Sequence, residues 1–525
     1  MTRLRISSLL VLPLAMACGD PTGLRPRSGR PGPGAMALPN VDAAHGARTT
    51  LSGWLRALAP LGALDLAQQG PKGPASIRVG EGWTSRGGGS VAALGGAPQW
   101  SRVIGEAGWD SAMQVVRYDA DEVAVVGFAT DGTVFGGACG TLDTGEREPG
   151  VPFLYASYVA RFDDSGACTW MASFGSDDAW PTAVAVDAAG DLFVVGQFNE
   201  RVDFGGAFDL ATAENAYDVF VARWDSVGAL SWATSITGPS DTWAYDAAVV
   251  EDGDGADLVL VGSYDGTLAL GATTLVSAGG YDMLVARYSS AGAVAFASGF
   301  GGSGEDELYA VAVASGTLVA GGYFNSATLP LGDAGTHASA GGFDAALVGF
   351  HGAGAPLWAL SFGGDGDDYV YDLTDAGGDV AAVGSFSGTL SIGGLGALSS
   401  NETSMFVAKL SAAGSAIWSH AVRSTNGVAY ATSVRSCGSG DVYVAGVIDG
   451  EAALGDTVLT PAAGSWSIVA ARYTSAGAAT PLWAAQKDGS SSIPYPVLGL
   501  TDGAVVLAAD STGNGGDIAL YALEP

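Results

Sequence analysis

Residues 183–232 read AVAVDAAGDLFVVGQFNERVDFGGAFDLATAENAYDVFVARWDSVGALSW. Three runs in this segment, 183–187, 192–196 and 218–224, have the apolar patterns of short strands, and a fourth run ends on Trp232. Gly190 and Gly228 mark tight turns, whereas a long insertion separates the second run from the third. The segment therefore predicts four short antiparallel strands with one long internal connection.

The same unit recurs along the chain from residue 100 onward. One four-stranded sheet of this length cannot bury both of its faces, so the units must stack on one another. The fourth strand of each unit carries an aromatic residue, about 60 to 70 residues from the next: Trp100, Trp170, Trp232, Phe296, Trp358, Trp418 and Trp483. We therefore predict an all-β fold, a seven-bladed β-propeller with four-stranded blades that spans residues 98–525.

The two ends of the repeat region are incomplete in complementary ways. The last unit ends after the strand at 517–521, while Trp100 belongs to a fourth strand with no partners before it. Pairing these two strands removes a free sheet edge. The sequence therefore predicts that the Trp100 strand closes the last blade.

The units resemble the repeats of a bacterial family of exported β-propellers, the SBBP type. Its units read roughly as W-x-x-x-F-G-G-x-G-x-D, V-x-V-D-x-x-G-[DN]-V-Y-V-x-G and D-x-F-V-A-K-L-D-x-x-G, and residues 358–367, 184–196 and 218–228 match these three parts. The resemblance covers about 425 residues. It implies a propeller fold in an exported protein and leaves the function open, because such repeats serve many proteins.

The first 18 residues have the composition of an export signal. Arg3 and Arg5 precede an apolar run, 6–17, that is too short to span a membrane, and small residues precede Cys18. The segment resembles the lipobox of bacterial lipoproteins, which implies lipid attachment at Cys18. Ala15-Met16-Ala17 also fits an ordinary cleavage site, which would leave a free thiol. We predict a signal peptide over 1–17 and a flexible tether rich in Gly, Pro and Arg over 18–97. The expected location is the outer membrane or cell surface, or otherwise the periplasm or the medium.

The charge of the chain is divided unevenly. Residues 1–99 carry a net charge of +6 and residues 100–525 a net charge of −38. An acidic body of this kind repels phosphate backbones, so nucleic-acid binding is not expected. The sequence has no Walker-type loop, G-x-S-x-G elbow or zinc-ligand spacing, so we predict neither a catalytic centre nor a cofactor. The lipid anchor is the only membrane contact expected, and the propeller is expected to be a monomer.

Five aspartates follow the repeat aromatic by eight to ten residues: Asp110, Asp178, Asp241, Asp306 and Asp367. In a propeller they would lie in the loops that lead from the outer strand of one blade to the inner strand of the next. Two interpretations stay open. The carboxylates could form a ring that holds calcium, or each could accept backbone N–H bonds and fix its turn.

Two other sets of residues predict contacts inside blades. Cys139 and Cys168 fall in the first blade, and because export permits oxidation we predict a disulfide between them. A basic residue also recurs at one position of the third strand, where we expect it to pair with the repeat aspartates inside its own blade: Arg161, Arg223, Arg287, Lys409 and Arg472.

The long units indicate where a ligand would bind. Each unit takes roughly 60 residues, whereas a WD-type blade takes about 40–45, and most of the surplus separates the second strand from the third. We expect a protein or glycan ligand on this long-loop face, unless the insertions are β-hairpins that only widen the rim. The predicted function is a non-catalytic binding or scaffold module at the cell envelope. The alternatives are an exported propeller enzyme acting on polysaccharide, as a hydrolase or lyase, and a calcium-dependent adhesion module.

Overall fold

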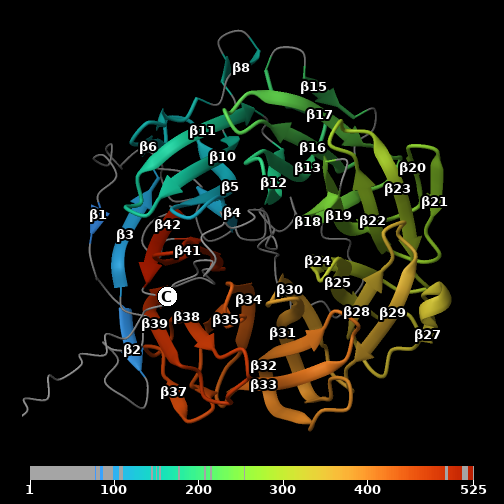
Figure 1. The fold of residues 1–525 in the computed structure, drawn as a ribbon, viewed down its shortest axis with the longest axis vertical. Coiled ribbons are helices and arrows are strands. Elements are labelled where there is room, and N and C mark those ends of the chain that lie inside the picture. Colours follow the sequence, from blue (N-terminus) through green and yellow to red (C-terminus); the bar gives the residue numbers. More distant parts are fainter. Residues whose placement is uncertain are drawn as a thin grey trace, which may run out of the picture.

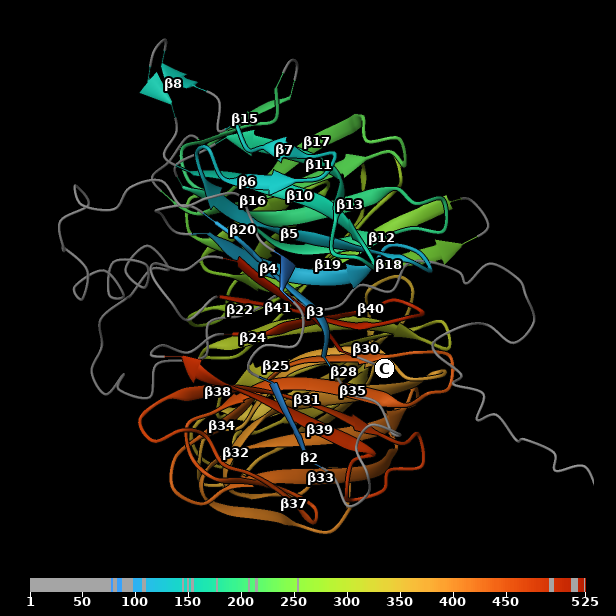
Figure 2. The ribbon, with the colours of Figure 1, turned by 90° about the vertical axis from the view of Figure 1, so that its left-hand side faces the viewer.

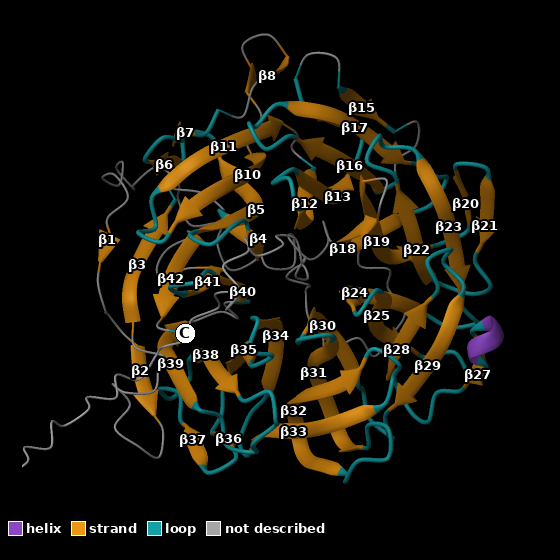
Figure 3. Cartoon of the chain, viewed as in Figure 1, coloured by secondary structure: helices purple, strands orange, loops and turns teal. Residues whose placement is uncertain are grey.

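Seven antiparallel sheets, each with four blade strands and some with added edge strands, stand around a central axis in the computed structural model of the chain (Figure 1). The structure describes residues 77–78, 83–86 and 98–525, apart from 106–109, 144–145, 149–150, 153–154, 176–177, 206–207, 213–215, 253–254, 491–494, 511–517 and 524. Strands dominate these residues, and the 3-10 turn η3 (Gly332–Ala334) is the helical segment visible in Figure 3. No helix in this part of the chain is long and apolar enough to cross a membrane. The predicted all-β, seven-bladed propeller is confirmed.

Blades 1 to 6 each run from the inner strand to the outer strand in chain order. Blades 1 to 3 contain β4 (Ser111–Arg117), β5 (Glu122–Thr130), β10 (Tyr155–Asp163) and β11 (Cys168–Gly175); β12 (Ala179–Val186), β13 (Leu192–Phe198), β16 (Asp218–Trp224) and β17 (Leu230–Ile236); and β18 (Thr242–Asp252), β19 (Gly255–Tyr264), β22 (Asp282–Tyr288) and β23 (Val294–Phe300). Blades 4 to 6 contain β24 (Asp306–Ala314), β25 (Thr317–Phe324), β28 (Asp344–Phe350) and β29 (Pro356–Phe362); β30 (Tyr369–Asp375), β31 (Asp379–Leu390), β32 (Leu398–Ser411) and β33 (Ala416–Ser424); and β34 (Ala429–Ser436), β35 (Val442–Ile448), β38 (Trp466–Tyr473) and β39 (Trp483–Ser490).

Blade 7 joins the two ends of the propeller. It contains β40 (Val497–Leu500), β41 (Val505–Asp510) and β42 (Ile518–Leu523), and its outer strand is β3 (Pro98–Ile104), where Trp100 pairs with Ala522. In the side view β3 lies in blue among the red C-terminal strands (Figure 2). Arg102 on β3 donates hydrogen bonds to the carbonyl groups of Gly166 and Phe135 in blade 1. The predicted closure is therefore confirmed, and its strand also contacts the neighbouring blade.

The range assigned to the tether needs a correction, because two strands lie within it. β1 (Ile77–Arg78) pairs with β3 of blade 7, and β2 (Trp83–Arg86) pairs with β39 of blade 6. Both lie on the outer edges of their sheets. These two short runs have no clear alternating pattern, and only their pairing with β3 and β39 gives them a structure. The remaining predicted tether and signal peptide lie outside the described residues.

The repeated aromatic residues are contacts between blades. Trp232 of blade 2 donates its indole N–H to the Ser290 carbonyl in the turn between the third and fourth strands of blade 3, at 2.9 Å. Gly292 in that turn has a φ of 80°, and a Cβ on it would lie 2.9 Å from the Trp232 ring. Trp358 and Trp418 contact the following blades in the same way. The aromatic and the turn glycine therefore recur together, because the ring needs the space that a side chain would fill.

Four of the five repeated basic residues pair inside their own blades, as predicted, but with other aspartates than the repeat aspartates that follow the aromatic. Each cation contacts an aspartate at or just before the start of the second strand: Arg223 with Asp191 at 2.5 Å, Arg287 with Asp257 at 2.7 Å, Lys409 with Asp379 at 3.2 Å and Arg472 with Asp441 at 2.8 Å. Arg161 instead lies over the rings of Tyr118 and Trp170, with its guanidinium carbon 4.6 and 5.3 Å from their centroids. Paired and partly buried charges of this kind fix geometry more than they add net stability.

Candidate functional site

The long connections and the loops between blades lie on one face of the propeller, which we call the long-loop face. In blade 3, Trp243 near the start of the inner strand pairs with Ser263 near the end of the second. Tyr264 ends the second strand and pairs with Asp282, which begins the third. The start of the inner strand, the end of the second strand and the start of the third therefore meet at the same edge of each sheet.

The insertions between second and third strands form β-hairpins at the rim, as one of the two interpretations of the sequence held. β14 (Arg201–Asp203) extends the sheet of blade 1 and pairs with β15 (Asp209–Ala211), and β36 (Ala452–Leu454) with β37 (Thr457–Leu459) extends blade 5. The hairpins of blades 3 and 4 are β20 (Thr267–Leu270) with β21 (Thr273–Val276) and β26 (Leu329–Pro330) with β27 (Thr336–His337). Buried Leu268, Leu329 and Leu454 anchor these hairpins in the core. The connection in blade 1 contains β6 (Val134–Gly136), β7 (Gly140–Thr141), β8 (Glu146–Glu148) and β9 (Val151–Pro152).

Nearer the axis, the long-loop face carries a group of aromatic side chains that we call the axial aromatic cluster. Most of them come from two positions that recur between blades, the first part of the inner strand and the residue before the third strand, whereas Tyr323 lies near the end of a second strand. Its members are Trp180, Tyr217, Trp243, Tyr245, Tyr281, Tyr309, Tyr323, Phe343, Tyr369, Tyr371 and Tyr430. Most of these rings are 3 to 8% exposed, whereas Tyr281 and Phe343 are half-buried.

Ring contacts join the cluster across four blades. Between blades 2 and 3, the ring centroids of Trp180 and Tyr217 lie 5.4 Å apart, as do those of Tyr217 and Trp243. Between blades 3 and 5 a second run passes from Tyr245 through Tyr309 and Tyr323 to Tyr369, with successive centroids 4.7, 5.2 and 5.1 Å apart. Aromatic pairs at these separations stabilise one another beyond the area that they bury.

Glu307 replaces an aromatic residue inside this cluster. It occupies the register position that Trp243 and Tyr369 hold in blades 3 and 5. Its carboxylate accepts hydrogen bonds from the hydroxyl groups of Tyr245 and Tyr323, both at 2.6 Å, and from Ser263 at 3.0 Å. Burial raises the pKa of Glu307, although these three donors lower it. Burial, followed by the charge of Glu307, raises the pKa of Tyr245 and Tyr323 well above the usual range of tyrosine. The carboxylate thus fixes the two rings on either side of it.

Below the cluster, polar side chains close the centre of the propeller. In three places a side chain on one inner strand accepts a backbone N–H from the inner strand of the next blade: Gln114 from Val184 at 2.5 Å, Asp246 from Val311 at 2.7 Å and Asp372 from Val434 at 2.5 Å. The side chains of Gln114, Asp246 and Asp372 have no exposed surface. Since buried N–H groups must be paired, these side chains complete the hydrogen bonding of strands that have no fifth strand at the axis.

Arg435 places a positive charge among these carboxylates. Its guanidinium donates to Asp372 at 3.1 Å and to the Val115 carbonyl of blade 1 at 3.0 Å, which spans the axis. Burial raises the pKa of Asp372 to about 7, and Arg435 opposes that rise. Burial also raises the pKa of Asp246 well above its usual range, and the neighbouring charge of Asp372 adds to the rise.

The structure divides the five predicted aspartates into two groups. Asp110 and Asp306 are buried just before or at the start of the inner strand, where Asp110 accepts the Thr130 N–H at 2.7 Å and Asp306 accepts the Gly302 N–H at the same distance. Asp178, Asp241 and Asp367 lie earlier in the loop and are exposed or half-buried. Asp241 and Asp367 accept the backbone N–H groups of Tyr217 and Phe343, at 2.9 and 3.0 Å. Their contacts are those of the turn-fixing interpretation, and two of them hold residues of the axial aromatic cluster.

No group of three or more His, Cys, Asp or Glu side chains is placed to hold a metal ion in the part of the chain that the structure describes. The calcium-dependent alternative thus receives no support from the five aspartates, and binding of a cation stays untested. Cys139 and Cys168 form a disulfide, the pair expected from the sequence. Cys18, the predicted site of lipid attachment, lies outside the described residues.

The sequence analysis missed the axial aromatic cluster, although a signal for it was present. Tyr217, Tyr281 and Phe343 each stand directly before the aspartate that begins a third strand, and all three blades repeat this pair. The fourth-strand aromatic is the more regular signal, and it marks the outer strands rather than the axis. Trp180 and Trp243 are each the second residue of an inner strand, and the sequence pattern does not place that strand's start without the pairing register.

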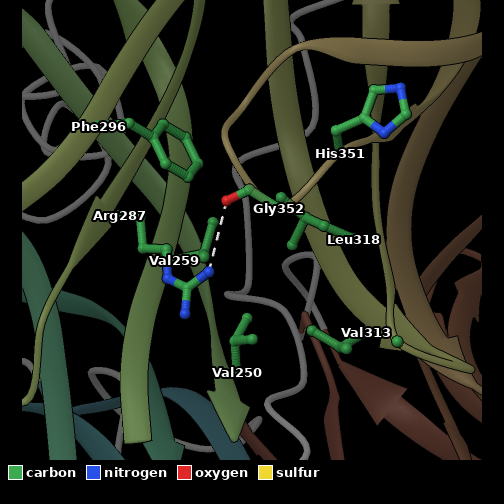
Figure 4. Close-up of a pocket in the computed structure, with 9 residues that line it drawn as sticks. Val250, Val259, Arg287, Phe296, Val313, Leu318, His351 and Gly352 are labelled. Atoms are coloured by element: carbon green, nitrogen blue, oxygen red, sulfur yellow. Dashed lines mark hydrogen bonds between the residues drawn. The ribbon is translucent and has the colours of Figure 1, made fainter. Parts of the chain in front are cut away.

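A pocket of about 300 Å³, including open solvent, lies between blades 3 and 4, away from the long-loop face (Figure 4). Phe296 stands here where the neighbouring junctions have a tryptophan, so the Gly352 carbonyl receives no indole N–H. Instead Arg287 donates to it at 3.4 Å. Val250, Val259 and Leu318 form the apolar wall. This pocket therefore arises from a smaller aromatic at one repeat position.

No family model matches the chain, and no curated protein matches it. Among solved structures, the chain is similar to the WD40 domain of SCAP from fission yeast, with 11% sequence identity, 84% of this chain and 98% of that chain covered, and a TM-score of 0.23. At that TM-score the likeness adds nothing to the fold, which rests on the strand pairings of the chain itself. On those pairings the protein is a seven-bladed β-propeller whose aromatic residues gather at one end of its axis.

Proposed function

We propose that this protein is an exported, lipid-anchored β-propeller that binds its ligand on the long-loop face and catalyses no reaction. The observation that carries this proposal is the axial aromatic cluster, which blades 2 to 6 build from equivalent positions. Aromatic side chains supply large contact areas with few rotatable bonds, and they are enriched at binding sites for that reason. A rigid propeller holds them in place before any ligand arrives.

The proposed anchoring rests on the N-terminal sequence. Arg3, Arg5, the apolar run 6–17 and Cys18 have the order of an export signal followed by an acylated cysteine. Metabolic labelling with a fatty-acid analogue should mark the wild type and leave Cys18→Ala unmarked. A wild-type protein that is secreted without label would instead support cleavage at the ordinary site, with Cys18 as a free thiol.

The binding face can be tested with the full-length protein on arrays of glycans and of purified envelope proteins. Trp243→Ala combined with Tyr281→Ala should abolish binding of whichever ligand the wild type selects. Val227→Ala changes a residue on the opposite face that is 83% exposed, and it serves as the matched control. Binding that survives the double substitution and is lost in Val227→Ala would refute the assignment of the face.

A second candidate function has one observation in its favour. Glu307 breaks the repeat pattern, and a non-repeating carboxylate beside tyrosine hydroxyls is a feature expected of a polysaccharide hydrolase or lyase. Binding is the stronger proposal, because both oxygens of Glu307 already accept hydrogen bonds from side chains of the propeller itself. Release of reducing ends or of unsaturated sugars from a polysaccharide, lost in Glu307→Gln with unchanged thermal stability, would favour the enzyme.

A further inference from the structure

Five residues of the axial aromatic cluster and its rim form a compact group over blades 2 and 3, which we call the blade 2–3 subsite. They are Trp180, Tyr217, Trp243, Tyr281 and Asp241. The rings of Tyr217 and Trp243 are nearly parallel, at 27°, and Trp180 continues the row. The subsite thus combines flat apolar surfaces with a small number of polar atoms, as ligand sites commonly do.

Trp180 contributes an unused hydrogen-bond donor to this subsite. Its side chain is 5% exposed, and its indole N–H has no partner among the described residues. Leaving a buried donor unpaired costs free energy, which is why such groups are rare. The tryptophans at three interblade junctions, by contrast, each donate to a backbone carbonyl. The unpaired donor therefore indicates an acceptor that the described chain does not provide.

Asp241 contributes acceptors beside the same rings. One of its oxygens accepts the Tyr217 N–H at 2.9 Å and the other accepts the Tyr281 hydroxyl at 3.3 Å. A carboxylate oxygen accepts more than one hydrogen bond, and Asp241 is half-buried, so acceptor capacity remains on its exposed side. A ligand for this subsite must offer both hydrogen-bond donors and an acceptor, together with a face of C–H groups for the rings.

We propose that the blade 2–3 subsite binds a neutral oligosaccharide. Sugar hydroxyl groups are donors and acceptors at once, so they match both Asp241 and the Trp180 indole N–H. The C–H face of a pyranose ring packs on an aromatic ring. Anionic polysaccharides are disfavoured by the net charge of −38 over residues 100–525. A quaternary ammonium ligand would suit the rings but has no acceptor for Trp180. This inference rests on the proposed function, because it names the ligand class of the same face.

The test uses the full-length protein and titration calorimetry with cellohexaose, chitohexaose, mannohexaose, xylohexaose and a trimethyllysine peptide. We expect at least one hexasaccharide to bind and the peptide not to bind. Trp180→Phe keeps a ring and removes the donor, so it should weaken the binding about five- to tenfold. Trp170→Phe is the matched control, because Trp170 lies in the outer strand of blade 1, away from the subsite. This variant should bind the hexasaccharide with the affinity of the wild type.

Three results would overturn the inference: no binding of any of the four hexasaccharides, unchanged affinity in Trp180→Phe, or binding of the peptide in preference to the sugars. Thermal melts of both variants identify a change that is only a loss of folding. Failure of this inference can be distinguished from failure of the proposed function. If the arrays identify a protein ligand that depends on Trp243 and Tyr281 while no hexasaccharide binds, the sugar is wrong and the binding face stands.

Discussion

At the scale of single residues, Phe296 explains the pocket between blades 3 and 4. It occupies the position of Trp232 and Trp358, where the indole ring fills the junction and its N–H reaches a turn carbonyl. Gly354 in the facing turn still leaves room for a large ring, since a Cβ there would lie 2.4 Å from Phe296. The junction therefore keeps the geometry of its neighbours with a smaller side chain inside it.

We expect Phe296→Trp to raise the free energy of unfolding by about 0.5–2 kcal/mol, because it fills the pocket and supplies a donor to the Gly352 carbonyl. Urea denaturation measures the change. The reverse change, Trp358→Phe, opens an equivalent pocket at the next junction and should lower stability by about 1–3 kcal/mol. A destabilised Phe296→Trp would mean that the turn of blade 4 has closed on the smaller ring and no longer accepts an indole.

The repeat aspartates show that spacing from the aromatic residue does not by itself identify structurally equivalent positions in different blades. Asp306 and Asp367 lie ten and nine residues after their repeat aromatics, and the sequence analysis treated them as equivalent. The pairing register puts Asp368, not Asp367, in the buried position of Asp306, where each accepts a glycine N–H. A shift of one residue along a strand moves a side chain to the other face. Loops of variable length hide that shift until the strands are paired.

At the scale of elements, the disulfide joins the blade 1 connection to the outer strand β11. Cys139 and Cys168 are 29 residues apart in sequence, and Cys168 is 2% exposed. Replacing both with alanine should lower the free energy of unfolding by about 3–4 kcal/mol, because the unfolded chain is no longer constrained by the loop. Urea denaturation of the variant and of the oxidised wild type measures this loss. Cys437→Ala is the control and should leave stability unchanged; an equal loss in both variants would contradict the assignment.

The edge strands β1 and β2 change what an N-terminal deletion should do. Deleting 19–76 removes none of the described strands and should leave the melting temperature unchanged. Deleting 19–90 removes β1 and β2, which pair through only six residues, and should lower it slightly. Deleting 19–105 also removes β3, exposes the edge of β42 and breaks the contacts of Arg102, so it should lower the melting temperature most. Equal melting temperatures for the last two deletions would refute closure through β3.

The repeat itself could be derived from sequence because its determinants are local. The turn glycines, the alternating strands and the fourth-strand aromatic all lie within one unit, and seven copies reinforce one another. β1 and β2 could not be derived in this way. A run of two or four residues carries no periodicity of its own, and the partner of β2 lies about 400 residues away.

At the scale of the whole molecule, buried carboxyl groups set the response to pH. Burial raises the pKa of Asp368 and Asp372 to about 7 and that of Asp282 to about 6, from about 4 in an unfolded chain. Between these values the unfolded chain has released protons that the folded protein still holds. The contribution of these groups to the free energy of unfolding is therefore fully present below about pH 4. It is lost as the pH rises through 7, and the loss is about 1.4 kcal/mol for each unit of difference between the folded and unfolded pKa.

We expect the melting temperature to rise as the pH is lowered from 8 to 5, the opposite of ordinary acid denaturation. Lower net charge acts in the same direction, since the chain carries −32 at pH 7. Differential scanning calorimetry at constant ionic strength measures the slope. The Asp372→Asn variant has no titrating carboxyl group at this position. Its melting temperature should therefore change less between pH 5 and 8 than that of the wild type. A melting temperature that falls steadily over this range would contradict the prediction.

The closure of blade 7 also has a consequence in time. β3 is made before any blade, and its partner β42 ends two residues before the end of the chain, with Trp100 opposite Ala522. A ribosome that releases the chain from its N-terminus must therefore deliver every strand from β4 to β42 before the ring can close. Contacts over such a separation form late and slowly. Until then blade 7 lacks the strand that pairs with β3, and the ring of blades stays open.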